Sequence, residues 1–342
     1  MKIRMIGPLP PPYGGATVYF QMLQEEIGKA SGVELEVIDT TTVSSARGAK
    51  KLLALLAVLR AAWSGTHRPD IISVHMSIGA LSLFAPYFGI VGKLTSTPVI
   101  IHRFGGNLIH QQRFPRALAL KIAYRVCGAA LIETKAQLAE VKALKTPTIW
   151  FPNIRKTPDS APPCKTQCRK FLYLSQVFPE KGIPELLDAF SSLNKKHPDT
   201  RLDIYGQILR NSYQVADFNH PGVAYQGVVK PDNVYATIAR YDALVLPTYY
   251  KGEGYPGIII EAFHLGLPVI TTRWQSVPDI VNDNCGILIP PKDSTALENA
   301  METLYADDTG YQHLAAGALA QAKDFSADQA VAKYLELCRS LT

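Results

Sequence analysis

The sequence predicts an α/β protein with two consecutive domains, each built on a doubly wound parallel sheet. Three observations carry this prediction. Short apolar runs alternate with helical patterns along the chain, which is typical of βαβ units. A proline-rich stretch, 156–168, breaks the alternation near the middle, and the pattern then restarts. The 342 residues also exceed what one ordinary hydrophobic core accommodates.

The first half, 1–155, supplies one domain. Each of its strands is a short, mostly apolar run bounded by turn residues, and its helices carry apolar residues at three- and four-residue spacing. The predicted strands are 2–6, 33–38, 71–75, 98–102, 129–134 and 148–151, and the predicted helices include 17–29 and 49–63.

The second domain is predicted over 156–325. Its strands are 169–174, 201–205, 223–226, 243–247, 268–271 and 286–289, and its helices include 183–193 and 258–265. A further helix over 326–341, with Ser326 as N-cap, either closes the second domain or packs back on the first. We expect the two domains to face each other across a cleft that holds the ligand.

Charge is unevenly distributed between the two halves. Residues 1–155 hold 18 Lys/Arg and 8 Asp/Glu, a net of +10, while the remainder holds 17 and 21, a net of −4. The halves are therefore expected to meet different partners. The basic half shows neither aromatic–basic interleaving nor a nucleic-acid-binding motif, so nucleic acid is excluded. An anionic membrane surface or a phosphate-bearing lipid fits it better.

Cysteine usage and hydropathy predict a reduced, cytoplasmic setting. Five cysteines, an odd number, argue against a disulfide framework. Cys164 and Cys168 have no second Cys or His pair nearby to complete a tetrahedral metal site, so free thiols are expected. The residues before Pro8 do not resemble a signal peptide. The longest apolar run, 78–91, is too short to span a membrane and contains Pro86.

A glycine-rich turn over 252–257 leads into the helix 258–265. The N–H groups and the dipole at such a helix start suit a diphosphate. Pro256 has no N–H, so the anion would be held by the N–H groups of Gly257, Ile258 and Ile259, with Gly254 in the adjoining loop.

Glu253 and Glu261 flank this turn. Carboxylates accept hydrogen bonds well from vicinal hydroxyls, so the pair can hold sugar hydroxyls on one side and ribose hydroxyls on the other. Taken singly, Glu261 could merely complement the helix dipole and Glu253 could be a solvated loop acid. Their spacing together with the glycine-rich turn favours a nucleotide-sugar site.

The string EGYPGIIIEAFHLGLPVITT, residues 253–272, resembles the signature of retaining glycosyltransferases of the GT-B fold, in particular glycosyltransferase family 4 of the bacterial cell-surface polysaccharide type. SQVFPEKGIPELLDAF resembles the strand, loop and helix that open the family's second domain. GPLPPPYGGA resembles the glycine loop of its first domain, and the likeness weakens across 40–125.

The resemblance implies roles for several residues. Lys181 would pair with the donor phosphates, and Gln176 stands where the family often has an arginine that stabilises the leaving group. Gly14 and Gly15 would let the backbone approach the donor. His102, expected at the end of its strand, would orient the sugar or assist the incoming hydroxyl. Arg103 would bind a donor or acceptor phosphate.

The activity implied is that of a retaining, metal-independent hexosyltransferase without a cofactor. A UDP- or GDP-linked sugar would be transferred by front-face attack to a lipid-linked saccharide, in O-antigen, capsule or exopolysaccharide synthesis. Helix 49–60 and a basic stretch with Arg113, Arg116, Lys121 and Arg125 suggest peripheral attachment to the inner face of the plasma membrane. For 49–60, an ordinary buried helix is the competing interpretation.

Three other function classes are compatible with parts of this sequence. A nucleotide-sugar epimerase or a sugar phosphorylase would use the same scaffold. A non-catalytic nucleotide-sugar-binding protein is favoured only by Gln176. An NAD oxidoreductase is disfavoured, because the loop after the first strand lacks the G-x-G-x-x-G fingerprint.

Overall fold

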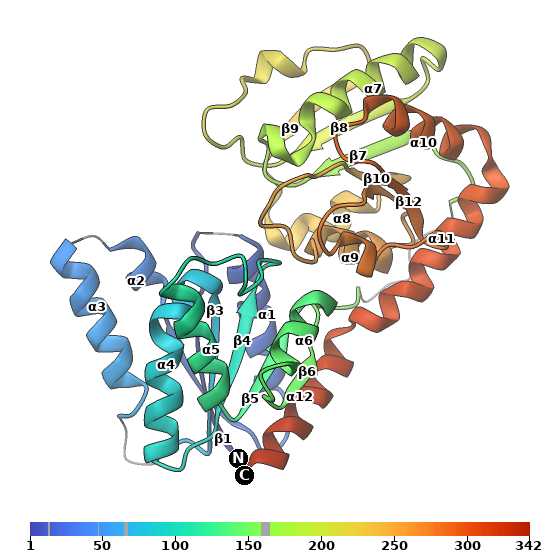
Figure 1. Cartoon of the computed structure of the whole chain (residues 1–342). Helices are drawn as coiled ribbons and strands as arrows, with labels where there is room; N and C mark the ends of the chain where they lie inside the picture. Colours follow the sequence, from blue (N-terminus) through green and yellow to red (C-terminus); the bar gives the residue numbers. More distant parts are fainter. Residues whose placement is uncertain (13, 47, 65–67, 159–164) are drawn as a thin grey trace. The chain divides into compact units, whose positions relative to one another are not determined.

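The computed structural model describes residues 1–12, 14–46, 48–64, 68–158 and 165–342 (Figure 1). It divides into two compact units. Unit 1 comprises Met1–Lys156 together with Ser326–Thr342, and unit 2 comprises Thr157–Phe325. Cys164, one half of the cysteine pair considered above, lies outside the described residues. The other four cysteines are buried free thiols: Cys127, Cys168, Cys285 and Cys338.

Unit 1 is built on a six-stranded parallel sheet with the order β2-β1-β3-β4-β5-β6. The strands are β1 Lys2–Gly7, β2 Glu34–Asp39, β3 Ile71–Ser77, β4 Val99–Phe104, β5 Ala129–Ile132 and β6 Thr148–Trp150. The helices are α1 Gly15–Gly28, α2 Thr41–Ser45, α3 Gly48–Ala61, α4 Ile78–Leu94, α5 Arg116–Val126, α6 Lys135–Lys142 and α12 Ala327–Leu341.

Helices cover both faces of this sheet (Figure 1). Because successive side chains of a strand point to opposite faces, each strand contributes to two cores. One core joins the sheet to α3, α4 and α5 through residues such as Val58, Phe84 and Tyr124. The other joins it to α1 and α12 through residues such as Phe20 and Tyr334.

Unit 2 repeats the architecture with the strand order β12-β11-β10-β7-β8-β9. The strands are β7 Lys170–Leu174, β8 Arg201–Tyr205, β9 Val223–Gly227, β10 Ala243–Leu246, β11 Val269–Thr272 and β12 Gly286–Ile289. The α-helices are α7 Ile183–Lys196, α8 Val234–Ile238, α9 Gly257–His264, α10 Ser294–Ala306 and α11 Asp308–Ala322, and a short 3₁₀ helix, η1, covers Pro179–Lys181.

Each unit has one point where the strand order reverses direction. In unit 1 it lies between β1 and β3, and in unit 2 between β7 and β10. In open doubly wound sheets, ligands bind at the carboxyl ends of the strands beside this switch point. The sheet order therefore directs attention to the loops after β1 and β3 and to those after β7 and β10.

The prediction of two doubly wound α/β domains is confirmed, and most strand bounds differ by one or two residues. β3 and β4 are longer than predicted and continue past His75 and His102. The C-terminal helix α12 is grouped with unit 1, where Tyr334 packs in the core beside α1. Its N-cap is Ser326, whose hydroxyl accepts from the Gln329 N–H at 3.5 Å. No helix of the described residues is both long and apolar enough to cross a membrane.

Candidate functional site

A buried ion pair lies at the switch point of unit 2. Lys181 ends η1 in the loop after β7, and Glu253 lies in the loop after β10. The Lys181 Nζ donates to Glu253 Oε2 at 2.6 Å, although 72 residues separate them. Their exposed fractions are only 7% and 8%. The sequence predicted a phosphate ligand and a sugar ligand at these two positions, and the fold joins them in direct contact.

Glu253 is fixed from within its own loop. Its Oε2 also accepts from the Thr248 hydroxyl at 2.7 Å, and its N–H donates to the Tyr250 carbonyl at 3.1 Å. That carbonyl also accepts from the Trp274 indole at 2.8 Å, which ties the loop to the residues after β11. Thr248, a small hydroxyl residue five positions before the glutamate, was not predicted from the sequence.

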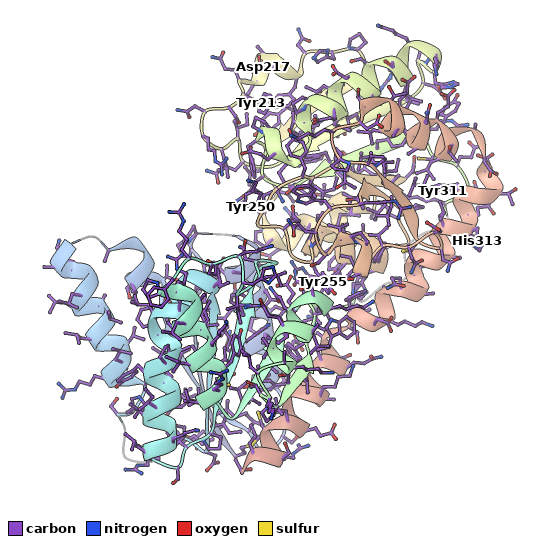
Figure 2. All side chains as sticks on the ribbon, in the orientation of Figure 1. Tyr213, Asp217, Tyr250, Tyr255, Tyr311 and His313 are labelled. Atoms are coloured by element: carbon purple, nitrogen blue, oxygen red, sulfur yellow. The ribbon has the colours of Figure 1, made fainter. Side chains whose placement is uncertain are left out.

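Lys181 is held by the close approach of two loops. Gly182 follows it with φ +80°, and a Cβ there would lie 2.2 Å from the Pro247 carbonyl oxygen. Only glycine fits both that conformation and that distance. The Tyr249 N–H donates to the Glu180 carbonyl at 2.9 Å. The Lys181 ammonium lies 5.6 Å from the centre of the ring of Tyr250, a residue that Figure 2 labels.

The α9 N-terminus adjoins the ion-pair loop. The first N–H groups of a helix have no intrahelical acceptor, which leaves those of Gly257 and Ile258 for a ligand. The prediction for Ile259 was wrong, because its N–H donates to the Pro256 carbonyl at 3.1 Å. Glu261 is half-buried on α9, one turn after Gly257, and Gly254 is buried in the preceding loop.

Gln176 is exposed in the loop between β7 and η1, and its carbonyl accepts from the Tyr173 hydroxyl at 2.7 Å. An arginine that was not predicted from the sequence, Arg210, follows β8 and approaches the segment after β7. Arg210 donates to Glu180 at 3.0 Å, and its guanidinium lies 4.9 Å from the centre of the Phe178 ring. Sequence spacing gave no signal for it, since it lies 34 residues from Gln176.

In unit 1, His102 and His75 form a buried pair instead of ending their strands. They are register partners on β4 and β3, and their Nδ1 atoms lie 3.0 Å apart. The Ser73 hydroxyl contacts His75 Nε2 at 2.8 Å. Burial lowers the pKa of His102 to about 3, and burial together with His102 holds the pKa of His75 well below its usual value. His102 is only 1% exposed.

Arg103 points to the opposite face of the sheet from His102 and is fully buried. Within the described residues, none of its guanidinium nitrogens has a hydrogen-bond partner. Its nearest anion is Glu140 on α6 at 3.9 Å, and the Tyr124 ring centre lies 5.7 Å away. Glu140 in turn accepts from the Ile109 N–H at 2.8 Å, so Arg103 lies behind the loop that follows β4.

Gly14 and Gly15 open α1 in the loop after β1. A Cβ at either would meet no described atom within 4 Å, and neither has a positive φ. The described part of unit 1 therefore gives no packing reason for glycine at these positions, although Gly14 is the N-cap of α1. Among the described residues, no group of three or more His, Cys, Asp or Glu side chains is arranged to hold a metal ion.

Comparison with known proteins matches residues 168–307, less than half of the chain, to the family described as Glycosyl transferases group 1. The O-antigen chain mannosyltransferase B of Escherichia coli is 28% identical over 169 residues, which cover 45% of this chain and 42% of that protein. The chain thus spans about two fifths of the length of this relative.

Two solved structures have a similar overall fold. The Anabaena protein Alr3699/HepE in complex with UDP has a TM-score of 0.75 and 17% identity, covering 99% of this chain and all of that one. Sucrose-phosphate synthase from Thermosynechococcus elongatus has a TM-score of 0.77 and 16% identity, covering 100% and 99%. With the two six-stranded parallel sheets, these neighbours identify the fold as GT-B, built from two Rossmann-like domains.

Proposed function

We propose that the chain is a retaining hexosyltransferase that moves a sugar from a UDP- or GDP-linked donor to a lipid-linked saccharide during cell-surface polysaccharide synthesis. The observation that carries the proposal is the buried Lys181–Glu253 pair at the switch point of unit 2, beside the α9 N-terminus. The group 1 glycosyl transferase match over 168–307 includes both residues. Unit 2 then binds the donor and unit 1 the acceptor.

The donor diphosphate is assigned to Lys181 and to the N–H groups of Gly257 and Ile258. An ammonium has three donor hydrogens, and Glu253 accepts one of them. The other two remain for phosphate oxygens, where their positive charge stabilises the departing nucleoside diphosphate. We propose that this charge takes the place of a metal ion, and that Gln176 contributes only a neutral hydrogen bond.

Glu253 is assigned to the sugar hydroxyls and Glu261 to the ribose. Double displacement would require a carboxylate nucleophile at C1. Glu253 is poorly suited to that role, because its Oε2 already accepts from Lys181 and Thr248 and its charge is neutralised at 2.6 Å. Front-face transfer, in which the leaving diphosphate takes the acceptor proton, fits this arrangement better.

In unit 1 we propose that Gly14 and Gly15 leave space for the substrate, since a Cβ at either would meet no described atom within 4 Å. His102 and Arg103 are too deeply buried to touch a ligand within unit 1. We therefore propose them as positioning residues. His102 packs against Phe104 with ring centres 5.0 Å apart, and Arg103 lies behind the loop after β4.

Attachment to an anionic membrane surface is proposed for the face formed by α3, α4 and α5. α3 packs Val58 on the core and exposes Leu52, Leu53 and Leu56, so it is amphipathic and not an ordinary buried helix. The exposed apolar residues are Leu83, Tyr87, Ile90 and Leu94 on α4, Leu118 and Ile122 on α5, and Phe114 just before α5. Residues 41–132 hold 11 Lys/Arg and one acidic residue, Asp70, which suits contact with anionic lipid on the cytoplasmic side.

Thermal shift with a panel of UDP- and GDP-sugars tests donor binding first. A ligand at 100 times its Kd stabilises the folded state by about 2.7 kcal/mol. One donor should produce this shift in the wild type and in the Lys230→Met control, whose lysine is exposed in unit 2, but not in Lys181→Met. Equal shifts in all three proteins would contradict the proposed donor site.

The chemistry is tested with the donor so identified. The anomeric configuration of the product should match that of the donor by NMR, and EDTA should leave the rate unchanged. Inversion would refute the front-face mechanism. A loss of rate that magnesium or manganese restores would refute the role given to Lys181. Isomerisation of the donor in the absence of any acceptor would instead favour an epimerase.

A further inference from the structure

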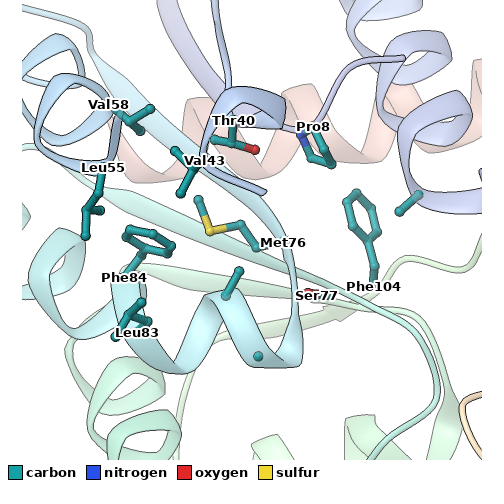
Figure 3. A pocket seen from close by; sticks show the side chains of 13 residues that line it. Pro8, Thr40, Val43, Leu55, Val58, Met76, Ser77, Leu83, Phe84 and Phe104 are labelled. Carbon is teal, nitrogen blue, oxygen red and sulfur yellow. The ribbon is translucent and has the colours of Figure 1, made fainter. Parts of the chain in front are cut away.

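Unit 1 contains an apolar pocket of about 370 Å³ (Figure 3). Eleven of its 13 lining residues are apolar or glycine, and the two exceptions are Thr40 and Ser77. The volume falls within the range of small-molecule sites, but such sites commonly offer more polar groups to fix a ligand's orientation. The chemistry of this lining suits a hydrocarbon group and not a saccharide.

The pocket lies at the switch point of unit 1. Its lining includes residues that follow or end three neighbouring strands. Pro8 and Ala16 flank the loop after β1, and Thr40 follows β2. Met76 and Ser77 end β3. It therefore occupies the carboxyl edge of the sheet, where doubly wound folds bind their ligands. Leu55 of α3 and Phe84 of α4 form its walls (Figure 3).

The pocket is continuous with the exposed apolar face of α4. Leu83 lines the pocket and is also 65% exposed, so it forms part of the mouth. Three further exposed apolar residues follow it on α4: Tyr87, Ile90 and Leu94. The spacing of four, three and four residues places them on the same side of the helix as Leu83. Leu83 therefore joins the pocket to this exposed apolar side of α4.

The surroundings favour a negatively charged head on that chain. The segment 41–132, which includes α3 and α4, holds 11 basic residues and one acidic residue. Lys50 and Arg60 are exposed on α3, whose Leu55 and Val58 line the pocket. The N-terminal end of the 17-residue α4, where Ser77 and Gly79 line the pocket, adds the positive end of a helix dipole.

We propose that this pocket binds the hydrocarbon chain of a phosphate-bearing lipid acceptor. This inference rests on the proposed function and deepens it, because unit 1 would recognise the lipid part of the acceptor directly and not only its saccharide. A membrane lipid that binds nonspecifically would need only the exposed face of α4. An acceptor lipid must in addition be held in one orientation, so that its saccharide reaches the donor. The pocket supplies that orientation at the edge of the sheet where the acceptor is assigned.

Dodecyl phosphate, titrated below its critical micelle concentration by calorimetry without vesicles, tests the proposal, with butyl phosphate as the short-chain control. Each methylene that leaves water is expected to tighten binding about fourfold. The wild type should therefore bind dodecyl phosphate far more tightly than butyl phosphate. Equal affinity for the two compounds would overturn the proposal.

Two variants on the same helix separate the pocket from the apolar face. Leu83→Glu and Leu94→Glu introduce the same charge at exposed positions, 65% and 80% exposed, so neither should disturb folding. Only Leu83 lines the pocket. Leu83→Glu should weaken dodecyl phosphate binding roughly tenfold or more, while Leu94→Glu should stay within about twofold. Equal losses would identify the general apolar face as the binding surface and overturn the proposal.

Ala80→Leu supplies an uncharged check, because it reduces the pocket volume without adding a charge at its mouth. It should weaken dodecyl phosphate and leave butyl phosphate unaffected. If Ala80→Leu unfolds the protein, the comparison of Leu83→Glu with Leu94→Glu still tests whether the chain binds in the pocket. Failure here is distinguishable from failure of the proposed function, because donor-induced thermal shift depends on Lys181 in unit 2. A normal donor shift without chain-length dependence refutes only the lipid pocket.

Discussion

The two units share one architecture but carry opposite chemistry at their switch points. In unit 2 the loops after β7 and β10 meet in a buried ion pair between Lys181 and Glu253. In unit 1 the loops after β1 and β3 border an apolar pocket with two polar lining residues, Thr40 and Ser77. The sheet determines where a ligand can bind, and the side chains at its carboxyl edge determine which ligand it is.

The two units also differ in how their glycines are surrounded. In unit 2, Gly182 and Gly206 have positive φ, and a Cβ at either would overlap a neighbouring backbone carbonyl. The fold itself therefore requires them. In unit 1, a Cβ at Gly14 or Gly15 would meet no atom of the described residues within 4 Å. A glycine that the fold does not need is better evidence for a ligand than one that it does.

The largest expected effect is the loss of the ion pair. Lys181→Met should lower kcat about 10²–10³-fold, because the charge on the leaving diphosphate loses its stabiliser. It should also reduce the free energy of unfolding by about 3 kcal/mol, because it leaves the Glu253 carboxylate buried and unpaired. Transfer assays and urea denaturation measure the two effects.

The double variant Lys181→Met/Glu253→Gln is the control for that prediction. Removing both charges should recover most of the stability but none of the activity. If the single variant is as stable as the wild type, the pair is not buried in solution as described.

The second-largest expected effect is the difference in stability between replacing a glycine that the fold requires and replacing one that it does not. Gly206→Ala should cost about 3 kcal/mol, because φ is +140° and the new Cβ would lie 1.7 Å from the Ser175 carbonyl oxygen. Gly15→Ala should leave the melting temperature unchanged or raise it, while donor or acceptor KM increases. A large stability loss in Gly15→Ala would show that the fold requires this glycine after all.

Third is the pH dependence of stability that the buried histidines impose on unit 1. The folded-state pKa of His102 is about 3, below the usual 6.5, so its contribution is present above pH 6.5 and is lost as pH falls toward 3. At pH 5 the loss for this one group is about 2 kcal/mol.

Melting temperatures recorded from pH 7.5 to pH 5 measure this loss. His102→Asn should flatten the curve, whereas the exposed His313→Asn in unit 2 should leave it unchanged (Figure 2). An unaltered slope in His102→Asn would mean that another group dominates acid sensitivity.

The smallest expected effect is at Gln176. Gln176→Arg should tighten donor binding by about 1 kcal/mol, roughly fivefold in Kd, because a charged fork replaces a neutral amide near the diphosphate. Gln226→Arg, the same change at another exposed position of unit 2, should leave Kd unaltered. Equal changes in both variants would point to net charge and not to the site.

The residues of the proposed site could be grouped from sequence only where they lie close together along the chain. Glu253, Gly257 and Glu261 fall within nine residues, so their spacing and the intervening turn could be read directly. Thr248 was missed because a threonine after a strand is common and carries no signal of its own. His102 was predicted to end its strand, but β4 continues for two more residues. His102 therefore lies in the core and not at the carboxyl edge of the sheet.

The sequence by itself determined the two doubly wound domains, since hydrophobic periodicity is local and repeats in every βαβ unit. It also determined the glycine-rich turn before α9 and the basic character of the first half. Only the tertiary structure decided that Lys181 contacts Glu253, that His75 pairs with His102, that α12 belongs to unit 1, and that an apolar pocket lies at the end of β3. These features join residues far apart in the chain, and which of them come into contact depends on sheet order and packing and not on spacing along the sequence.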